Sequence, residues 1–234
     1  MTMKDKTIII NQFRGLGDVL FLIPMVRHLM ENGNRVIFPT YFTDLQKHFP
    51  DVLFVEKTLL NIDYNCREFR ETNGALVLPI RFADSIMGLS YRNHMGSKYR
   101  IMDLPVNMWR TLTWERDKKA ERRLFHKVLE LRENSDYALV QEVFTTEENR
   151  RTTINPPTML PQVKLEPTKG FTLLDWGMVI ENATEIYAVS TSSLYLFEIM
   201  ELKAKELHLY TRTGVEDHFD YVNYLLQKDW VFHK

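Results

Sequence analysis

Two glycines and a carboxylate stand together near the start of the chain, in the string Arg14-Gly15-Leu16-Gly17-Asp18. Glycine lets the backbone turn tightly and approach a ligand, and a helix that begins behind such a turn presents unpaired N–H groups and a positive dipole end. The third glycine of a dinucleotide fingerprint is absent, and no Lys-Ser/Thr pair follows as in a P-loop. Asp18 is therefore either a helix N-cap or a carboxylate held for proton transfer.

A second polar string, between a predicted strand and a predicted helix, consists of Ser190, Thr191, Ser192 and Ser193. Hydroxyls and backbone N–H groups at a helix start can bind an anion, although plain helix capping needs only one of these hydroxyls. Glu198 lies further along the same predicted helix. Its carboxylate could accept hydrogen bonds from ribose hydroxyls, or it could have only a solvent-facing or capping role.

Three arginines are the candidate cations for a phosphate group. Arg150 and Arg151 follow a predicted strand in a polar loop, and Arg212 ends another predicted strand. A guanidinium at the end of a strand can bind a phosphate group. The alternative for the Arg150-Arg151 pair is an ordinary solvated surface.

The string FRGLGDVLFLIPMVRHL, residues 13–29, resembles the start of the heptosyltransferase-like glycosyltransferases of family 9, which have the GT-B fold. The matching positions are Gly17, Asp18, Leu20, Pro24 and Leu29. The resemblance implies a nucleotide-sugar donor bound by the C-terminal half, an acceptor bound by the N-terminal half, and Asp18 as the general base. Because the family relies on a single carboxylate, it also implies inversion at the sugar carbon.

The function that the resemblance implies is metal-independent transfer of a sugar from a nucleotide-sugar to an acceptor hydroxyl. The donor is a substrate, and no further cofactor is expected. The donor-side residues are Ser190, Thr191, Ser192, Ser193, Glu198, Arg150, Arg151 and Arg212, and Arg14, Gly15 and Gly17 form the loop before Asp18. The alternative is a non-catalytic nucleotide- or saccharide-binding protein that retains the fold, because Ser190 stands where the family often has an acidic residue.

A third segment, YRNHMGSKYR at 91–100, interleaves basic and aromatic residues. Such a pattern can bind a nucleic acid, but the formal charge of the chain is only −1. We therefore interpret the segment as either an acceptor-binding surface or an amphipathic surface helix. Nucleic acid is not excluded as the acceptor.

The elements that position these residues alternate between strands and helices, which is typical of parallel α/β sheets. We expect a compact α/β protein with two Rossmann-like halves facing a cleft: an acceptor-side domain at 1–130 and a nucleotide-sugar-binding domain at 131–234. The expected strands are 7–11, 35–40, 51–57, 74–80, 136–144, 162–166, 185–190 and 206–212. The expected helices are 19–31, 42–49 with Thr43 as N-cap, 109–132, 171–183, 191–200 and 216–226.

The composition fits this class. The chain has 234 residues, of which 44% are hydrophobic and 26% charged, so it is long enough to bury a sizeable core. Its one cysteine, Cys66, excludes an intrachain disulfide, and the seven histidines show no metal-binding spacing. Without an export signal or a transmembrane run, we expect a cytoplasmic protein.

Overall fold

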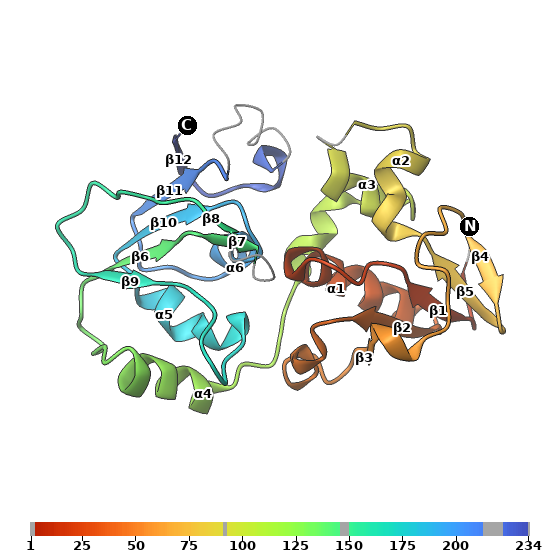
Figure 1. Ribbon diagram of the computed structural model, residues 1–234, viewed down its shortest axis with the longest axis horizontal. Coiled ribbons are helices and arrows are strands. Elements are labelled where there is room, and N and C mark those ends of the chain that lie inside the picture. Colours follow the sequence, from red (N-terminus) through yellow and green to blue (C-terminus); the bar gives the residue numbers. More distant parts are fainter. Residues whose placement is uncertain (1–2, 91–92, 146–149, 213–221, 234) are drawn as a thin grey trace. The chain divides into compact units, whose positions relative to one another are not determined.

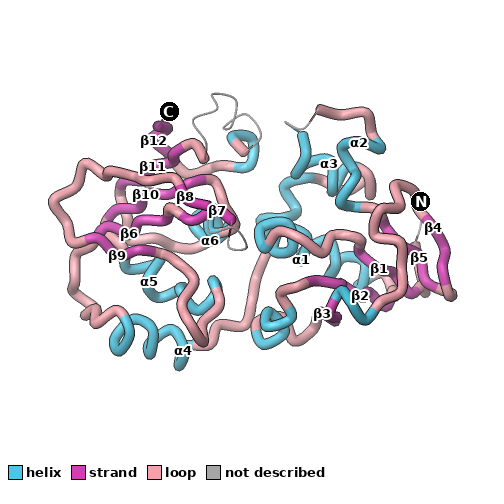
Figure 2. The backbone as a smooth tube through the Cα atoms, in the orientation of Figure 1, coloured by secondary structure: helices cyan, strands magenta, loops and turns pink. Residues whose placement is uncertain are grey.

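The computed structural model describes residues 3–90, 93–145, 150–212 and 222–233. The chain divides into two compact units, Met1–Glu115 (unit 1) and Arg116–Lys234 (unit 2), each with its own sheet (Figure 1). Figure 2 shows strands and helices following one another along both units, as predicted. Among the described residues, no helix is long and apolar enough to cross a membrane.

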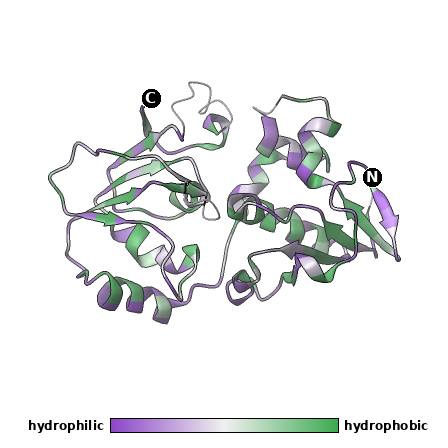
Figure 3. Ribbon diagram, in the orientation of Figure 1, coloured by the Kyte–Doolittle hydropathy of each residue, from purple (hydrophilic) through white to green (hydrophobic). Residues whose placement is uncertain are grey.

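Unit 1 is built on a five-stranded sheet in the order β3-β2-β1-β5-β4. The first four are parallel, and β4 pairs antiparallel with β5 at the edge. The parallel strands are short apolar runs, as expected for strands covered on both faces. Strand β4 was not predicted, since its sequence is hydrophilic (Figure 3). The bounds are β1 Thr7–Ile10, β2 Arg35–Thr40, β3 Leu53–Glu56, β4 Arg70–Thr72 and β5 Ala75–Leu78.

The central helix of unit 1 is α1, Leu16–Glu31, whose apolar residues are buried along most of its length. A smaller helix, α3 (His94–Arg100), is fixed to it by Tyr99. The Tyr99 hydroxyl donates to the Phe21 carbonyl at 2.7 Å, and the two rings pack edge to face with centroids 5.0 Å apart. This contact sets the position of α3 beside the start of α1. The remaining helix is α2, Ala83–Ile86, and 3₁₀ turns lie at Thr43–Lys47, Lys57–Leu59, Ile80–Phe82 and Val106–Thr111.

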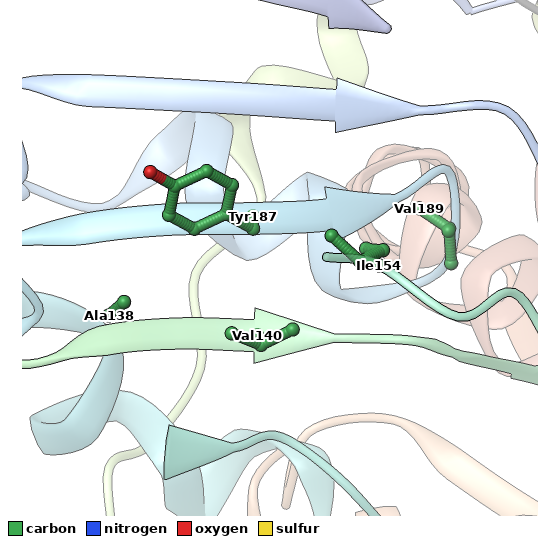
Figure 4. Packing of buried hydrophobic residues seen from close by; sticks show 5 residues of the cluster. All are labelled: Ala138, Val140, Ile154, Tyr187 and Val189. Carbon is green, nitrogen blue, oxygen red and sulfur yellow. The ribbon is translucent and has the colours of Figure 1, made fainter. Parts of the chain in front are cut away.

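Unit 2 has a five-stranded, all-parallel sheet in the order β12-β11-β10-β6-β9. One face packs Ala138, Val140, Tyr187 and Val189 against Ile154 (Figure 4). The strand bounds are β6 Ala138–Gln141, β9 Gln162–Lys164, β10 Glu185–Val189, β11 Glu206–Tyr210 and β12 Trp230–His233. A separate antiparallel pair is formed by β7 Val143–Thr145 and β8 Arg150–Arg151.

The helices of unit 2 are shorter than predicted. The expected helix 171–183 is a 3₁₀ turn, Leu173–Trp176, that runs into α5, Gly177–Asn182. The helix α6 spans Ser193–Ile199, within the expected 191–200. The expected helix 216–226 lies largely outside the described residues, and of its described part Asn223–Leu225 forms a 3₁₀ turn. Strand β12 after it was not predicted.

The prediction of one helix over 109–132, and with it the domain boundary at 130, is wrong. The 3₁₀ turn ends at Thr111, and a new helix, α4, spans Lys118–Arg123 and continues as a π-helical turn, Leu124–Val128. The reason is tertiary: Trp109 is buried in unit 1 against Phe21, whereas Arg116 pairs within unit 2. The chain must therefore leave one core before it enters the other. Thr43 is also not an N-cap, because Phe42 precedes that turn.

Arg116 anchors the start of unit 2. Its guanidinium donates to Glu121 Oε1 and Oε2 at 2.7 and 2.6 Å, and it also hydrogen-bonds both oxygens of Glu181. The Glu121 side chain is only 1% exposed. A bidentate arginine thus satisfies both oxygens of this buried carboxylate.

Replacing Arg116 by methionine should lower the free energy of unfolding by about 3 kcal/mol, because the buried Glu121 carboxylate would lose its bidentate partner and keep only the half-exposed Lys118 ammonium at 3.6 Å. Urea denaturation followed by circular dichroism measures the change. The matched control is Lys203→Met, which removes an exposed ion pair with Asp136 and should change little. Equal effects of the two substitutions would contradict the anchoring role.

Candidate functional site

Each sheet has a switch point, where the chain order reverses between two parallel neighbours. In unit 1 this is between β1 and β5. Just beyond the strands, the Asn11 N–H donates to the Leu78 carbonyl at 2.9 Å and the Arg81 N–H donates to the Asn11 carbonyl at 3.0 Å. Open α/β sheets bind ligands at such a point, outside the carboxyl ends of the strands. The loop from Gln12 to Asp18 starts from this place.

Asp18 lies in the first turn of α1 and does not cap it. The N-cap residue is Gly15, with φ +76°, and no side chain makes a capping hydrogen bond. The N-cap alternative for Asp18 is therefore wrong. A Cβ at position 15 would lie 2.3 Å from Asp18 Oδ2, so the carboxylate occupies the space that a side chain at 15 would need. Gly17 is part of the first helical turn.

A buried lysine holds the Asp18 carboxylate. Lys98, on α3, has a fully buried side chain, and its Nζ lies 3.1 Å from Asp18 Oδ1. The same ammonium donates to Gln12 Oε1 at 2.8 Å, and Gln12 Nε2 in turn donates to the Arg14 carbonyl at 2.8 Å. A buried charge requires such partners. The contact fixes the carboxylate in place.

The Asp18 carboxylate is not saturated by these contacts. Oδ1 is buried and accepts no hydrogen bond from the described residues, so the lysine contact is an ion pair without hydrogen-bond geometry. The side chain as a whole is 23% exposed, and that exposure belongs to its other atoms. An oriented and partly exposed carboxylate is chemically able to accept a proton.

His94 completes the polar cluster. Its Nε2 lies 3.8 Å from Asp18 Oδ1, and its Nδ1 lies 3.1 Å from Asp84 Oδ2. Burial lowers the pKa of His94, and the Lys98 ammonium lowers it further, against the opposing effect of the two carboxylates. The imidazole is therefore neutral near pH 7. Because a carboxylate only accepts hydrogen bonds, Nδ1 donates to Asp84 and Nε2 carries the lone pair of the neutral imidazole.

The sequence singled out the segment 91–100, but its role became visible only in the structure. We expected a surface, and the structure instead buries most of α3, including Lys98 and Tyr99. The surface-helix interpretation is thus wrong. Two of the residues singled out there, His94 and Lys98, are nevertheless the ones that meet Asp18; Tyr91 and Arg92 lie outside the described residues. A buried lysine has no signature of its own in a sequence, because lysine is almost always exposed.

In unit 2 the switch point lies between β6 and β10. Gln141 ends β6, Ser190 follows β10, and Thr191 Oγ1 bridges the two strand ends by donating to Gln141 Oε1 at 3.2 Å. Thr191 Oγ1 also lies 2.9 Å from Ser193 Oγ. Arg212 comes from the end of β11, and its Nε donates to the Ser190 carbonyl.

The structure therefore brings Arg212, which follows β11, to the segment Ser190–Ser193, which follows β10. Ser192 precedes α6 at the N-cap position and makes no side-chain capping hydrogen bond. Capping thus does not account for this string of hydroxyls. Hydroxyl groups beside a guanidinium at a strand edge form a donor set suited to a phosphate.

Two other predicted donor-side groups are placed differently. Glu198 is buried, and its carboxylate accepts hydrogen bonds from the Gln227 N–H at 2.8 Å and from Trp230 Nε1 at 2.7 Å. It anchors the segment leading into β12, which argues against the ribose contact. Arg150 and Arg151 form β8, paired with β7, so they lie in a strand and not in a loop.

Solved structures with a similar fold are glycosyltransferases. The glycosyl transferase family 9 protein of Veillonella parvula DSM 2008 matches with a TM-score of 0.57 and 10% identity, over 100% of this chain and 87% of its own. The iron-containing dodecameric glycosyltransferase TibC of enterotoxigenic E. coli H10407 matches with a TM-score of 0.53 and 12% identity, over 90% of this chain and 59% of its own.

The chain has the GT-B fold of these glycosyltransferases. The resemblance that residues 13–29 carry in the sequence is thereby confirmed at the level of fold. A scan against protein-family models and a search of curated proteins each gave no match. In this GT-B chain the two polar clusters, around Asp18 in unit 1 and around Arg212 in unit 2, each lie at the switch point of their own sheet.

Replacing Gly15 by alanine should displace Asp18 as well as strain the backbone. Gly74 is the matched control, because its φ of +75° is nearly the same and no atom lies within 4 Å of an added Cβ. Gly74→Ala should lower the free energy of unfolding by about 1 kcal/mol, which is the usual effect of an alanine in the left-handed region. Gly15→Ala should cost clearly more in urea denaturation. Equal losses would show that the carboxylate does not occupy the place described.

The lowered pKa of His94 makes stability depend on pH. As the pH falls below about 6.5, the unfolded chain takes up a proton that the folded state resists, so the free energy of unfolding decreases. The wild type should therefore lose more thermal stability between pH 7.5 and pH 5.5 than His94→Gln, which cannot be protonated. Differential scanning fluorimetry at both pH values provides the comparison, and identical losses would refute the assignment.

Proposed function

We propose that the protein is a glycosyltransferase that moves a sugar from a nucleotide-sugar to an acceptor hydroxyl, without a catalytic metal and with Asp18 as the general base. The observation that carries the proposal is the Asp18–Lys98 pair at the switch point of unit 1. A fold used by glycosyltransferases and a carboxylate held at its ligand-binding edge support the same reaction.

In the proposed reaction, the acceptor oxygen forms a bond to the anomeric carbon of the donor sugar. The bond from that carbon to the diphosphate oxygen breaks, and its electron pair leaves with the nucleotide. The acceptor proton passes to Asp18, and His94 can receive it from there. Because a single displacement is involved, the configuration at the anomeric carbon inverts.

Lys98 has a positioning role in this scheme. Its buried ammonium, 3.1 Å from Asp18 Oδ1, holds the carboxylate in one orientation. Gln12 and the contact of Tyr99 with α1 hold the lysine itself. The base is therefore oriented before the acceptor binds, which reduces the reorganisation that the reaction requires.

On the donor side, Arg212 and the hydroxyls of Thr191 and Ser193 are the residues we propose for the diphosphate. The guanidinium is held to the Ser190 backbone through Nε. A positive charge fixed beside the leaving group would stabilise the negative charge that builds up as the glycosidic bond breaks. Arg150 and Arg151 remain additional candidates on β8.

The test begins with the nucleotide. Thermal shift measurements with UDP, GDP, ADP and CMP identify the ligand that stabilises the fold. Sugars linked to that nucleotide are then incubated with the protein and a pool of acceptors, and nucleotide release is followed. Asp18→Asn, which keeps the size of the side chain, should reduce the rate by about 10²- to 10⁴-fold while nucleotide binding is retained.

Asp44→Asn is the matched control, since Asp44 is an exposed carboxylate in the same unit, and its rate should equal that of the wild type. Asp18→Asn with an undiminished rate would refute Asp18 as the base. Nucleotide binding without release from any donor would support instead a non-catalytic nucleotide-binding protein with the same fold.

A further inference from the structure

The helix α4 and the π-helical turn that continues it have one side made of cations. The exposed residues among 118–127 are all lysine or arginine: Lys118, Lys119, Arg122, Arg123 and Lys127. We call these five residues the α4 cation face. The buried residues of the same segment are Ala120, Glu121, Leu124 and Phe125, and Figure 3 shows hydrophilic and hydrophobic residues alternating along α4. Helical periodicity therefore gathers the cations on the side opposite the core.

The carboxylates of this segment lie away from the α4 cation face. Glu121 is buried and bound by the Arg116 guanidinium, and only Lys118 also comes near it, at 3.6 Å. Asp117 precedes α4 and caps it through its side chain. The next carboxylate along the chain, Glu130, follows the end of the π-helical turn. Positive charge is thus separated from negative charge within the segment.

Three of the five cations have no carboxylate partner. Within the part of the chain that the structure describes, Lys119, Arg122 and Lys127 form no ion pair. Arg123 lies over the Phe171 ring at 4.6 Å, which holds its guanidinium against the surface of unit 2. The formal charge of the whole chain is only −1, so this excess of positive charge is local. Like charges held together repel, and a partner with several negative charges would relieve that repulsion.

A layer of phosphates fits the α4 cation face. The helix with its π-helical turn, 118–128, is about 16 Å long, and its cations lie on one side, so they can meet a flat surface together. Clusters of this size on a helix attract anionic lipid headgroups. The same segment ends in Val128, an apolar side chain that is 46% exposed. Such a side chain can enter the headgroup region of a bilayer.

We infer that the α4 cation face is a docking surface for an anionic lipid bilayer, which it binds through the phosphates of the headgroups. The inference does not depend on the proposed sugar transfer, because α4 contributes no residue to the clusters around Asp18 and Arg212. It adds an interaction surface to unit 2.

Other anionic partners fit the α4 cation face less well. Single-stranded nucleic acids bind where aromatic rings stack on the bases, but the face has no aromatic side chain and the Phe171 ring beside it already lies under Arg123. Protein interfaces have an apolar core with aromatic residues, whereas the centre of this face is cationic. A bilayer requires neither feature.

Co-sedimentation of the full chain with lipid vesicles tests the inference. Vesicles in which about a third of the lipid is phosphatidylglycerol should bind at least about tenfold more tightly than vesicles of phosphatidylcholine alone, and high salt should abolish the difference. The triple variant Lys119→Gln/Arg122→Gln/Lys127→Gln should lose about 10²-fold in binding, since each cation near an anionic membrane contributes about fivefold. Circular dichroism checks that the variant is folded.

The matched control is Lys4→Gln/Arg35→Gln/Arg70→Gln, which removes three exposed cations from unit 1 and should bind the anionic vesicles like the wild type. Equal binding to both kinds of vesicle would overturn the inference, and so would equal losses in the two triple variants. Tighter binding to a short duplex or single-stranded DNA than to the anionic vesicles would assign the face to nucleic acid instead. Because no nucleotide or turnover is involved, these outcomes are separate from success or failure of the glycosyltransferase assay.

Discussion

The ion pair between Asp18 and Lys98 is the interaction on which the organisation of unit 1 depends. An ammonium with no solvent exposure is stable only with partners on the surrounding elements, and it finds them on α1 and at the end of β1. The loop needs Gly15 because the carboxylate fills the space of a side chain there. The hydrogen bond from Tyr99 to the Phe21 carbonyl holds α3 against α1, and Lys98 thereby lies beside Asp18. Together these contacts hold one carboxylate in a fixed orientation with part of its side chain exposed.

The two units have similar sheets but different polar residues at the ends of the strands. Short apolar strands form each sheet, and polar residues appear as soon as the strands end at the switch point. In unit 1 these residues are a carboxylate, an imidazole and several cations; in unit 2 they are hydroxyls and a guanidinium. The chemistry at the ends of the strands therefore differs between the two units, although both sheets have the parallel α/β architecture of the GT-B fold.

Much of the fold could be read from hydrophobic periodicity. The strand 35–40 has the predicted bounds, and β1, β5, β10 and β11 lie within theirs. The failures share a cause. The run 109–132 has helical spacing, but Trp109 and Arg116 belong to different cores, so the helix is interrupted. β4 is hydrophilic, and β12 holds its place partly because Trp230 donates to the buried Glu198. Local pattern does not contain such long-range contacts.

The sequence by itself determined the alternation of strands and helices, the glycine turn, the position of Asp18 behind it and the hydroxyl string at 190–193, because these depend on neighbours along the chain. The tertiary structure decided which role each residue can have. Asp18 is not the N-cap of its helix and pairs instead with a buried lysine. Arg212 hydrogen-bonds the Ser190 carbonyl, and Glu198 hydrogen-bonds the C-terminal segment. Charges and hydrogen bonds act through space, so a partner 80 residues away, as Lys98 is from Asp18, is defined only once the chain has folded.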